Sequence, residues 1–461
     1  MMKTPIFFTS ILFLISSLFG CGPSEENVQY DAPNIVFLFS DDQSSPDLGA
    51  YGNSAIQTPN LDRLAEEGMV FRRGYVTSSQ CSPSRASILT GRSPHVVGAS
   101  RLHIDAQPRY ESLIEKLNER GYYTGAFRKV HQTEIQEQFD FYGGGDAAFS
   151  SFFESVPENQ PFFLWFGTTD PHRGYNVDEY EYQHNPEDVL VPEYLPDTQE
   201  VRKDLANYYN EITRFDTESG EILNLLEERG LSENTMVVVS SDNGMPFPRA
   251  KATLYEAGVR VPLIIKWPNH VDPGSTDELV SLVDLPATWL DAAGSEIPEG
   301  FGGKSLLPFF EDSTNDHREY IFAERNWHDN WDPMRAVIGD RYKLIQNYRP
   351  ELEYIPTLDI LNSPSYQEIQ RLKEEGELSG NLSWYEAASR PQVEFYDLVS
   401  DPNEWNNLAE DAEYDSLINQ YQQILSEWMN ETNDFLPAPK GSFPAGSNLN
   451  DMYDPLNAEE Y

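Results

Sequence analysis

The stretch "NIVFLFSDDQ", residues 34 to 43, decides the fold. Its apolar run is short and contains β-branched residues, which is typical of a strand buried on both faces of a parallel sheet. The run stops at two acids, Asp41 and Asp42. In open α/β sheets, the residues beyond the carboxyl ends of the strands form the reactive edge. The stretch therefore predicts a parallel sheet with carboxylates at its functional edge.

Similar strand patterns recur along the chain and alternate with helical ones. The runs "PFFLWFGTTDPH" (161–172) and "TMVVVSSDNG" (235–244) read as buried strands, and "TPNLDRLAEEGM" (58–69) and residues 204–230 as amphipathic helices. This alternation predicts an α/β fold with a large mixed, mostly parallel sheet flanked by helices. The rule for strand ends then collects six side chains along one edge: Asp41, Asp42, Asp170, His172, Asp242 and Asn243.

The pattern changes from about residue 326 to short aromatic strands. The stretch "MRAVIGDRYKLIQNY" (334–348) predicts a hairpin with a Gly-Asp turn, and residues 414–431 predict a helix. We therefore expect a larger domain over residues 33–325 and a smaller α+β module with an antiparallel sheet, plus a polar tail, over residues 326–461.

The charge balance excludes one class of partner. The chain has 32 Lys and Arg against 76 Asp and Glu, a formal net charge of −44. A surface this acidic repels nucleic acids and anionic membranes, so no nucleic-acid partner is expected. With 39% hydrophobic and 13% aromatic residues, the chain can still form a packed core.

Residues 1–21, "MMKTPIFFTSILFLISSLFGC", have the features of an export signal. Their apolar run is too short to span a membrane. The ending "LFGC" resembles a bacterial lipobox, in which Cys21 would carry the lipid, and residues 22–32 would form an acidic tether. An ordinary signal peptide cut nearby is the alternative. We expect an exported lipoprotein of the outer membrane or cell surface, held to the membrane only by its lipid and facing either the medium or the periplasm.

The second of the two cysteines lies in "TSSQCSPSRASILTGR" (77–92), and the stretch from residue 85 predicts a short helix. If Cys21 carries lipid, Cys81 has no disulfide partner. A polar segment that retains an unpaired cysteine raises the question of what the thiol is for.

The acids at the strand ends have the composition of a metal site. Asp41, Asp42, Asp242 and Asn243 offer hard oxygen ligands, which suit Ca²⁺ or Mg²⁺ rather than zinc. Adjacent acids at a single strand end are commonly a solvated turn. Two such pairs, each ending a buried strand, favour a metal.

Cations and histidines follow the same segments. Arg85, Lys129 and Lys251 could hold a small tetrahedral anion, although each alone would pass for a surface salt bridge. His131 and His172 are candidates for proton transfer, since histidine titrates near neutrality. Four further histidines are expected to be ordinary surface or structural residues: His184, His270, His317 and His328.

The stretch "CSPSRASILTGR" has the form Cys-x-Pro-x-Arg followed by Thr-Gly-Arg, which resembles the signature of the type I sulfatases. Further stretches occur in family order: "PNIVFLFSDD", "GYYTGAFRKVH", "DPHR", "VVVSSDNG" and "KATLYEAGVRVPLIIKWP". The stretches "NSAIQTPNLDRLA", "SSQCSPSRAS" and "SSDNGMPFP" resemble the heparan N-sulfatases within this family. The resemblance implies an alkaline-phosphatase-like fold, with residues 33–325 as the catalytic domain.

The resemblance also implies a set of roles. In members of the family, the signature cysteine, which corresponds to Cys81 here, is oxidised after translation to Cα-formylglycine. The hydrate of this residue attacks sulfur. One Ca²⁺ per chain would be held by Asp41, Asp42, Asp242 and Asn243, with residue 81 beside it. Arg85, Lys129 and Lys251 would hold sulfate oxygens or the hydrate. His172 would protonate the leaving group, and His131 would take the proton that releases sulfate. His103 and Arg173 are our candidates for contacts with the sugar.

Two partners follow from this resemblance: a sulfated saccharide and a maturation enzyme that generates formylglycine by reading Pro83 and Arg85. Three departures leave the N-sulfate or O-sulfate bond open. Arg128 replaces the usual Gly before Lys129, Lys251 stands where the N-sulfatases have Arg, and "YEAGVR" is closer to the O-sulfatases.

We therefore expect a sulfatase acting on a sulfated polysaccharide or its oligosaccharides, either an algal glycan such as ulvan or a glycosaminoglycan. The alternatives are an enzyme specific for N-sulfoglucosamine, a phosphomonoester or phosphonate hydrolase of the same superfamily, and a non-catalytic glycan-binding lipoprotein.

Overall fold

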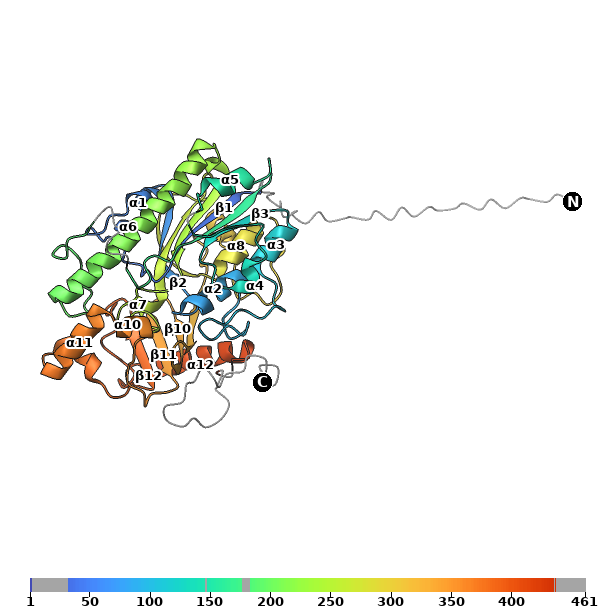
Figure 1. The fold of residues 1–461 in the computed structure, drawn as a ribbon. Coiled ribbons are helices and arrows are strands. Elements are labelled where there is room, and N and C mark those ends of the chain that lie inside the picture. The colour runs from blue at the N-terminus through green and yellow to red at the C-terminus, as the bar shows by residue number, and fades with distance from the viewer. Residues whose placement is uncertain (2–31, 146, 176–182, 435, 437–461) are drawn as a thin grey trace.

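A computed structural model of the chain describes residue 1 and residues 32–145, 147–175, 183–434 and 436 (Figure 1). The predicted signal segment, Cys21 and most of the tether and tail lie outside these residues. The described chain forms an eight-stranded sheet and a four-stranded sheet. No helix within the described ranges is both long enough and apolar enough to cross a membrane.

The large sheet has the strand order β4-β3-β5-β1-β6-β7-β2-β8. Its central strand β1 pairs in parallel with β5 and β6, whereas β7 runs antiparallel to both its neighbours. The predicted mixed, mostly parallel sheet is therefore confirmed. The strands are β1 (Asn34–Ser40), β2 (Met69–Tyr75), β3 (Tyr123–Arg128), β4 (Phe141–Gly143), β5 (Phe162–Gly167), β6 (Thr235–Ser241), β7 (Arg260–Lys266) and β8 (Gly274–Ser281).

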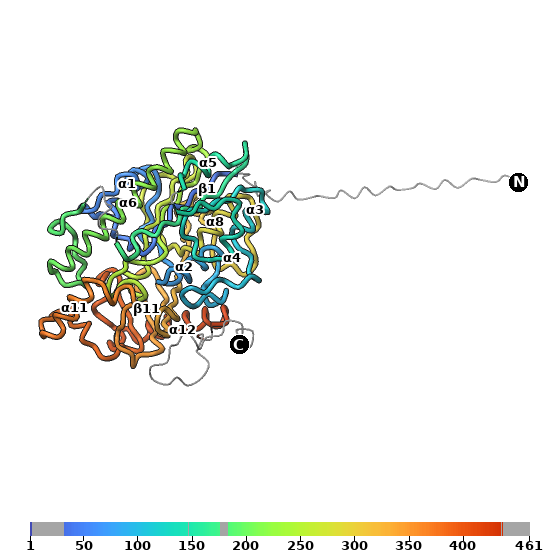
Figure 2. The backbone as a smooth tube through the Cα atoms, viewed as in Figure 1, coloured from blue at the N-terminus to red at the C-terminus, as the bar shows by residue number. Residues whose placement is uncertain are grey.

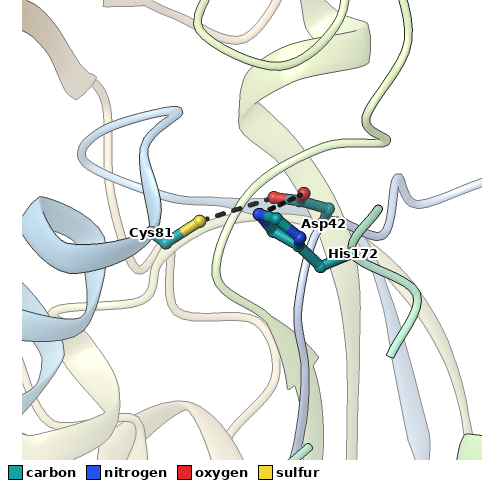
Figure 3. Close-up of side chains that lie close together, drawn as sticks. All are labelled: Asp42, Cys81 and His172. Atoms are coloured by element: carbon teal, nitrogen blue, oxygen red, sulfur yellow. Dashed lines mark hydrogen bonds and ion pairs between the residues drawn. The ribbon is translucent and has the colours of Figure 1, made fainter. Parts of the chain in front are cut away.

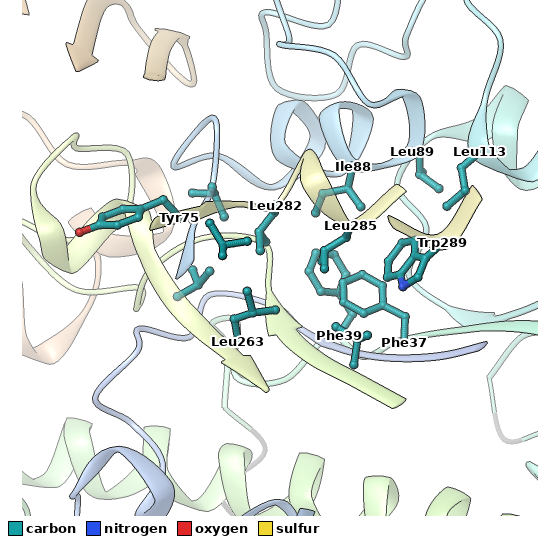
Figure 4. Packing of buried hydrophobic residues seen from close by; sticks show 14 of the residues in the cluster. Phe37, Phe39, Tyr75, Ile88, Leu89, Leu113, Leu263, Leu282, Leu285 and Trp289 are labelled. Atoms are coloured by element: carbon teal, nitrogen blue, oxygen red, sulfur yellow. The ribbon is translucent and has the colours of Figure 1, made fainter. Parts of the chain in front are cut away.

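Helices cover both faces of this sheet because the buried strands are apolar on both sides. Val36 and Leu38 of β1 belong to the core cluster that also contains residues of α1, α5 and α6. The alternate residues Phe37 and Phe39 face the cluster formed with α2, α3 and α8, where Trp289 packs against Phe37 (Figure 4). The covering helices are α1 (Pro59–Glu66), α5 (Ser150–Ser155) and α6 (Gln199–Glu228) on one face, and α2 (Cys81–Thr90), α3 (Leu113–Glu119) and α8 (Asp284–Ala292) on the other.

The small sheet is antiparallel, in the order β12-β11-β10-β9. The predicted hairpin is confirmed, since β10 and β11 pair antiparallel across a turn that contains Gly339 and Asp340. Its strands are β9 (Ile321–Trp327), β10 (Trp331–Ile338), β11 (Tyr342–Asn347) and β12 (Val393–Asp397), and α12 (Asp415–Glu431) packs on one face. Because β9 begins at Ile321, this sheet includes residues that precede the predicted boundary at 325.

The C-terminal segments are joined closely to the large sheet, as the orange and red parts of the trace show (Figure 2). The backbone N–H of Glu324 in β9 donates to the carbonyl of Thr77, four residues before Cys81. The helix α11 (Pro364–Glu375) packs against α6. Four shorter helices complete the described chain: α4 (Thr133–Gln136), α7 (Glu256–Val259), α9 (Leu307–Glu311) and α10 (Leu358–Leu361). The small module can therefore contribute residues to a site at the edge of the large sheet.

Candidate active site

Four neighbouring strands of the large sheet deliver their following residues to one edge. The strands β3, β5, β1 and β6 are neighbours in that order. The segments that follow them contain, respectively, Lys129, His172, the Asp41–Asp42 pair and the Asp242–Asn243 pair. The backbone N–H of Asp42 donates to Asp242 Oδ1 at 3.0 Å, so the two acid pairs are in contact. The convergence that the strand-end rule predicts is present for these residues, whereas the carboxylate of Asp170 accepts hydrogen bonds from Arg214 on α6.

Cys81 joins this edge as the first residue of α2. Its Sγ lies 3.6 Å from Asp42 Oδ1 (Figure 3). The ligand atoms of Asp41, Asp42, Cys81 and Asp242 lie within 4.8 Å of one another. All four residues are buried. The first turn of a helix presents unpaired N–H groups and a partial positive charge, so α2 begins where an anion would be stabilised.

Three cations surround the carboxylates. Arg85 donates from Nε to Asp242 Oδ2 at 2.7 Å, Lys251 Nζ lies 2.7 Å from Asp42 Oδ2, and Lys129 pairs with Asp41. Arg85 and Lys251 are almost completely buried. Charge-assisted contacts of this kind are strong in a site from which water is excluded. The acidic protein therefore has a locally balanced cluster that could accept an anion.

Asp41, which follows β1, and Asp242, which follows β6, differ in pKa. Burial opposes the charge of Asp41, but Lys129 and Arg85 outweigh it and hold its pKa well below the ordinary value. Burial and the nearby charge of Asp41 raise the pKa of Asp242 to about 7, although Arg85 acts in the opposite direction. The protein groups alone thus leave one carboxylate poorly compensated.

The same cluster fits a hard divalent cation. Asp41 Oδ1 and Asn243 Oδ1 are buried, and no donor among the described residues hydrogen-bonds to either. Buried oxygens without partners are costly, and a bound cation removes that cost. Carboxylate and amide oxygens are also the ligands that Ca²⁺ and Mg²⁺ prefer.

Both candidate histidines lie beside the cluster. His172 Nε2 is 3.8 Å from Asp42 Oδ2, and its side chain is 31% exposed. Burial, together with Lys129 and Arg85, lowers the pKa of His131 to about 3, so this imidazole stays neutral. His131 Nε2 lies 2.8 Å from Nδ1 of His103, which places the exposed His103 at the rim of the site.

Arg173, which we expected to contact the sugar, is instead held by a residue of α6. Its guanidinium makes two hydrogen bonds of 2.8 Å to Asp204 on α6 and stacks over the ring of Phe247. The side chain is only 8% exposed. Because its guanidinium pairs with the buried carboxylate of Asp204, Arg173 is not available for the predicted sugar contact.

Arg128, which replaces the family's usual Gly, has φ of 59°. This left-handed conformation favours glycine, which explains the family preference. Here the guanidinium of Arg128 makes two hydrogen bonds, of 2.6 and 2.7 Å, to Glu218 on α6. These contacts compensate for the conformational cost without reaching the carboxylate cluster.

Two residues near the site escaped sequence reasoning. Asp359 of α10 lies 2.8 Å from Lys251 Nζ and 3.7 Å from His172 Nε2. His328 was expected to be ordinary, yet it is buried and lowers the pKa of His103, an effect second to burial. Both come from the C-terminal module, far along the chain from the other acids and histidines at the sheet edge, and no local pattern marks them.

Comparison with known proteins now identifies the family. Residues 33–157 and 145–295 match the sulfatase family, and residues 249–380 match the family described as N-sulphoglucosamine sulphohydrolase, C-terminal. The chain belongs to the sulfatase family. It is therefore a sulfuric ester hydrolase by family, in agreement with the signature around Cys81.

Individual sulfatases are similar over most of the chain. An ulvan-active sulfatase of Formosa agariphila is 31% identical over 89% of this chain and 77% of its own length. The human N-sulphoglucosamine sulphohydrolase is 32% identical over 88% and 92%. A structure from work on glycosaminoglycan metabolism by Bacteroides thetaiotaomicron superposes with a TM-score of 0.70 at 19% identity, covering 88% of this chain and 97% of that one. This last similarity concerns the fold alone.

Proposed function

We propose that this sulfatase uses Cα-formylglycine made from Cys81, and one Ca²⁺, to release sulfate from sulfated polysaccharides or their oligosaccharides. The observation that carries the proposal is the position of Cys81. Burial raises the pKa of the Cys81 thiol well above the ordinary value, so the unmodified thiol is inert. Its Sγ nevertheless lies among three carboxylates and faces two lysines.

The sulfur marks where the oxygens of the modified residue would lie. As a hydrate, formylglycine supplies one hydroxyl that attacks sulfur and a second whose proton can be removed to release sulfate. Lys129 and Lys251 are placed to hold sulfate oxygens, and Arg85 fixes Asp242 through its 2.7 Å hydrogen bond. His172, whose side chain is partly exposed, would protonate the leaving group, and the neutral His131 would accept the proton of the second hydroxyl.

The calcium ligands in this proposal are Asp41, Asp42, Asp242 and Asn243, with residue 81 adjacent. A cation held there supplies positive charge toward the negative charge that develops in the transition state. The raised pKa of Asp242 and the two buried oxygens without donors support a divalent cation at this position. The preference for Ca²⁺ over Mg²⁺ rests on the family.

A maturation enzyme is a necessary partner. It would read Cys81, Pro83 and Arg85, all of which are buried in the folded chain. We infer that the oxidation precedes folding, because the folded protein offers no access to the motif.

The substrate class rests on the relatives. One is described as ulvan-active and the other as an N-sulphoglucosamine sulphohydrolase, at nearly equal identity. The match of residues 249–380 favours N-sulfoglucosamine as the second candidate substrate. Attachment through lipidated Cys21 at the outer membrane or cell surface, as proposed from the sequence, would suit an enzyme that meets large glycans outside the cell.

The decisive experiment is mass spectrometry of the tryptic peptide that contains position 81, combined with sulfate release from a panel of sulfated saccharides. An aldehyde at position 81 and released sulfate are expected. An intact thiol in a protein that binds glycans without turning them over would indicate the binding lipoprotein instead. Faster turnover of phosphate or phosphonate monoesters than of any sulfate ester would indicate the related hydrolase class.

A further inference from the structure

Asp359 places a second carboxylate on the side of the site where His172 lies. Its Oδ2 is 2.8 Å from Lys251 Nζ and 3.7 Å from His172 Nε2. The same two groups also face Asp42, at 2.7 and 3.8 Å. One ammonium group is therefore shared by two carboxylates, Asp42 and Asp359.

The segment that carries Asp359 is fixed against the site. The backbone N–H of Leu358 donates to Asp329 Oδ2 at 2.8 Å, and Asp329 contacts His328 at 2.9 Å. In the same stretch of chain, Leu358 is 59% exposed and Ile355 is 43% exposed. Asp359 thus belongs to an anchored segment that also exposes apolar side chains, and small-molecule sites are lined mainly by apolar groups with a few polar ones.

The geometry relates Asp359 to the leaving group. The sulfate group would lie between residue 81 and the lysines, and the atom that His172 protonates must lie within hydrogen-bond reach of its Nε2. Since Asp359 Oδ2 is 3.7 Å from that nitrogen, substituents next to the scissile bond face this carboxylate.

We propose that Asp359 is a specificity-determining residue, which favours substrates with a hydroxyl or amine next to the sulfated position and disfavours those with a second sulfate or a carboxylate there. This inference rests on the proposed function and refines its substrate class. A carboxylate accepts a hydrogen bond from a neighbouring O–H or N–H, whereas two like charges brought together in a pocket repel strongly.

The test uses three small probes in place of the unidentified saccharide: nitrophenyl sulfate, and its derivatives with a hydroxymethyl or a carboxylate group ortho to the sulfate. The wild-type enzyme should prefer the hydroxymethyl over the carboxylate derivative by at least about tenfold in kcat/KM. Asp359→Asn should reduce this preference to about threefold or less, mainly by improving the carboxylate derivative relative to the other two.

Two variants serve as controls. Asp359→Glu keeps the charge and should keep the preference. Glu351→Gln removes a charge from the same segment at an exposed position paired with Arg349, and should leave the preference at the wild-type value. If Asp359→Asn lacks turnover, the two derivatives are compared for binding to Cys81→Ala and to Cys81→Ala/Asp359→Asn, with thermal melts to verify folding. The same loss of preference is expected there.

The outcomes separate the two proposals. Turnover of nitrophenyl sulfate by the wild type with an unchanged preference in Asp359→Asn overturns the role of Asp359 and leaves the sulfatase function intact. Absence of an aldehyde at position 81 and of turnover of any probe overturns the proposed function itself. An unchanged preference in the binding comparison likewise overturns the role of Asp359.

Discussion

Among the described residues, two separate groups of largely buried ionisable side chains lie close enough to hold a metal, and they are built differently. The first is the cluster of Asp41, Asp42, Cys81 and Asp242, and the second, the Arg335 cluster, consists of His95, Glu324 and Asp434 around the guanidinium of Arg335. Arg335 bonds to Asp434 and to the side chain of Asn326, and both oxygens of Glu324 contact His95.

The difference lies in which oxygens are satisfied. In the Arg335 cluster a protein cation lies between the acids, and each of the four carboxylate oxygens has a partner. In the first cluster, Asp41 Oδ1 and Asn243 Oδ1 have no donor among the described residues. Proximity of acids is therefore not evidence for a metal by itself. The Arg335 cluster joins β9, β10 and the end of the described chain, and we interpret it as structural.

The strongest way to sharpen this comparison is to remove the thiol. Cys81→Ala should reduce sulfate release by at least about 10³-fold, because the attacking group is lost. The melting temperature should change little, since only one small side chain is truncated. Sulfate release near the wild-type rate would contradict the assignment of residue 81 as the precursor of the nucleophile.

A matched pair of cation deletions separates chemistry from stability. Lys129→Met should lower kcat/KM by about 10²–10³-fold, the usual loss for one pre-aimed charged group. Arg335→Met should leave kcat/KM of the folded fraction unchanged but lower the free energy of unfolding by about 3–5 kcal/mol, because it leaves buried acids without a cation. Denaturant unfolding and steady-state kinetics on both variants provide the measurements. A catalytic defect confined to Arg335→Met would reverse the comparison.

Metal removal probes the same contrast. Chelation of Ca²⁺ should lower both activity and melting temperature, and saturation at a hundred times the Kd should stabilise the protein by about 2.7 kcal/mol. Titration calorimetry should give one Ca²⁺ per chain, lost in Asp242→Asn and retained in Asp434→Asn. A second ion that disappears in Asp434→Asn would show that the Arg335 cluster also binds metal.

The smallest effect concerns pH. Burial opposes protonation of His95, but Glu324 outweighs it and raises the pKa of His95 above its ordinary value of 6.5. The protonated form therefore stabilises the fold. This contribution should be complete below pH 6.5 and should be lost as pH rises through the pKa of the folded state. Unfolding curves across that range should show the loss in the wild type and a smaller one in His95→Asn and Glu324→Gln. Equal slopes in all three proteins would remove His95 from this role.

Much of the fold can be predicted from local patterns. The apolar runs of β1, β5 and β6 are short, continuous and end in polar residues, so they indicate parallel strands and their reactive ends. The strands β2 and β8 escaped prediction because they mix apolar with charged residues, such as Arg72 and Arg73 in β2 and Asp277 and Glu278 in β8. Strands near a sheet edge carry a weaker hydrophobic signal.

The sequence by itself determined the family signature at Cys81, the acid pairs of the first cluster and the strands that carry them, because each lies within a few neighbouring residues. Only the tertiary structure decided that Asp204 pairs with Arg173, that Asp359 and His328 of the C-terminal module lie near the site, and that Arg335 lies between the acids of the Arg335 cluster. These contacts join residues far apart in the chain, and their partners are fixed by packing rather than by local periodicity.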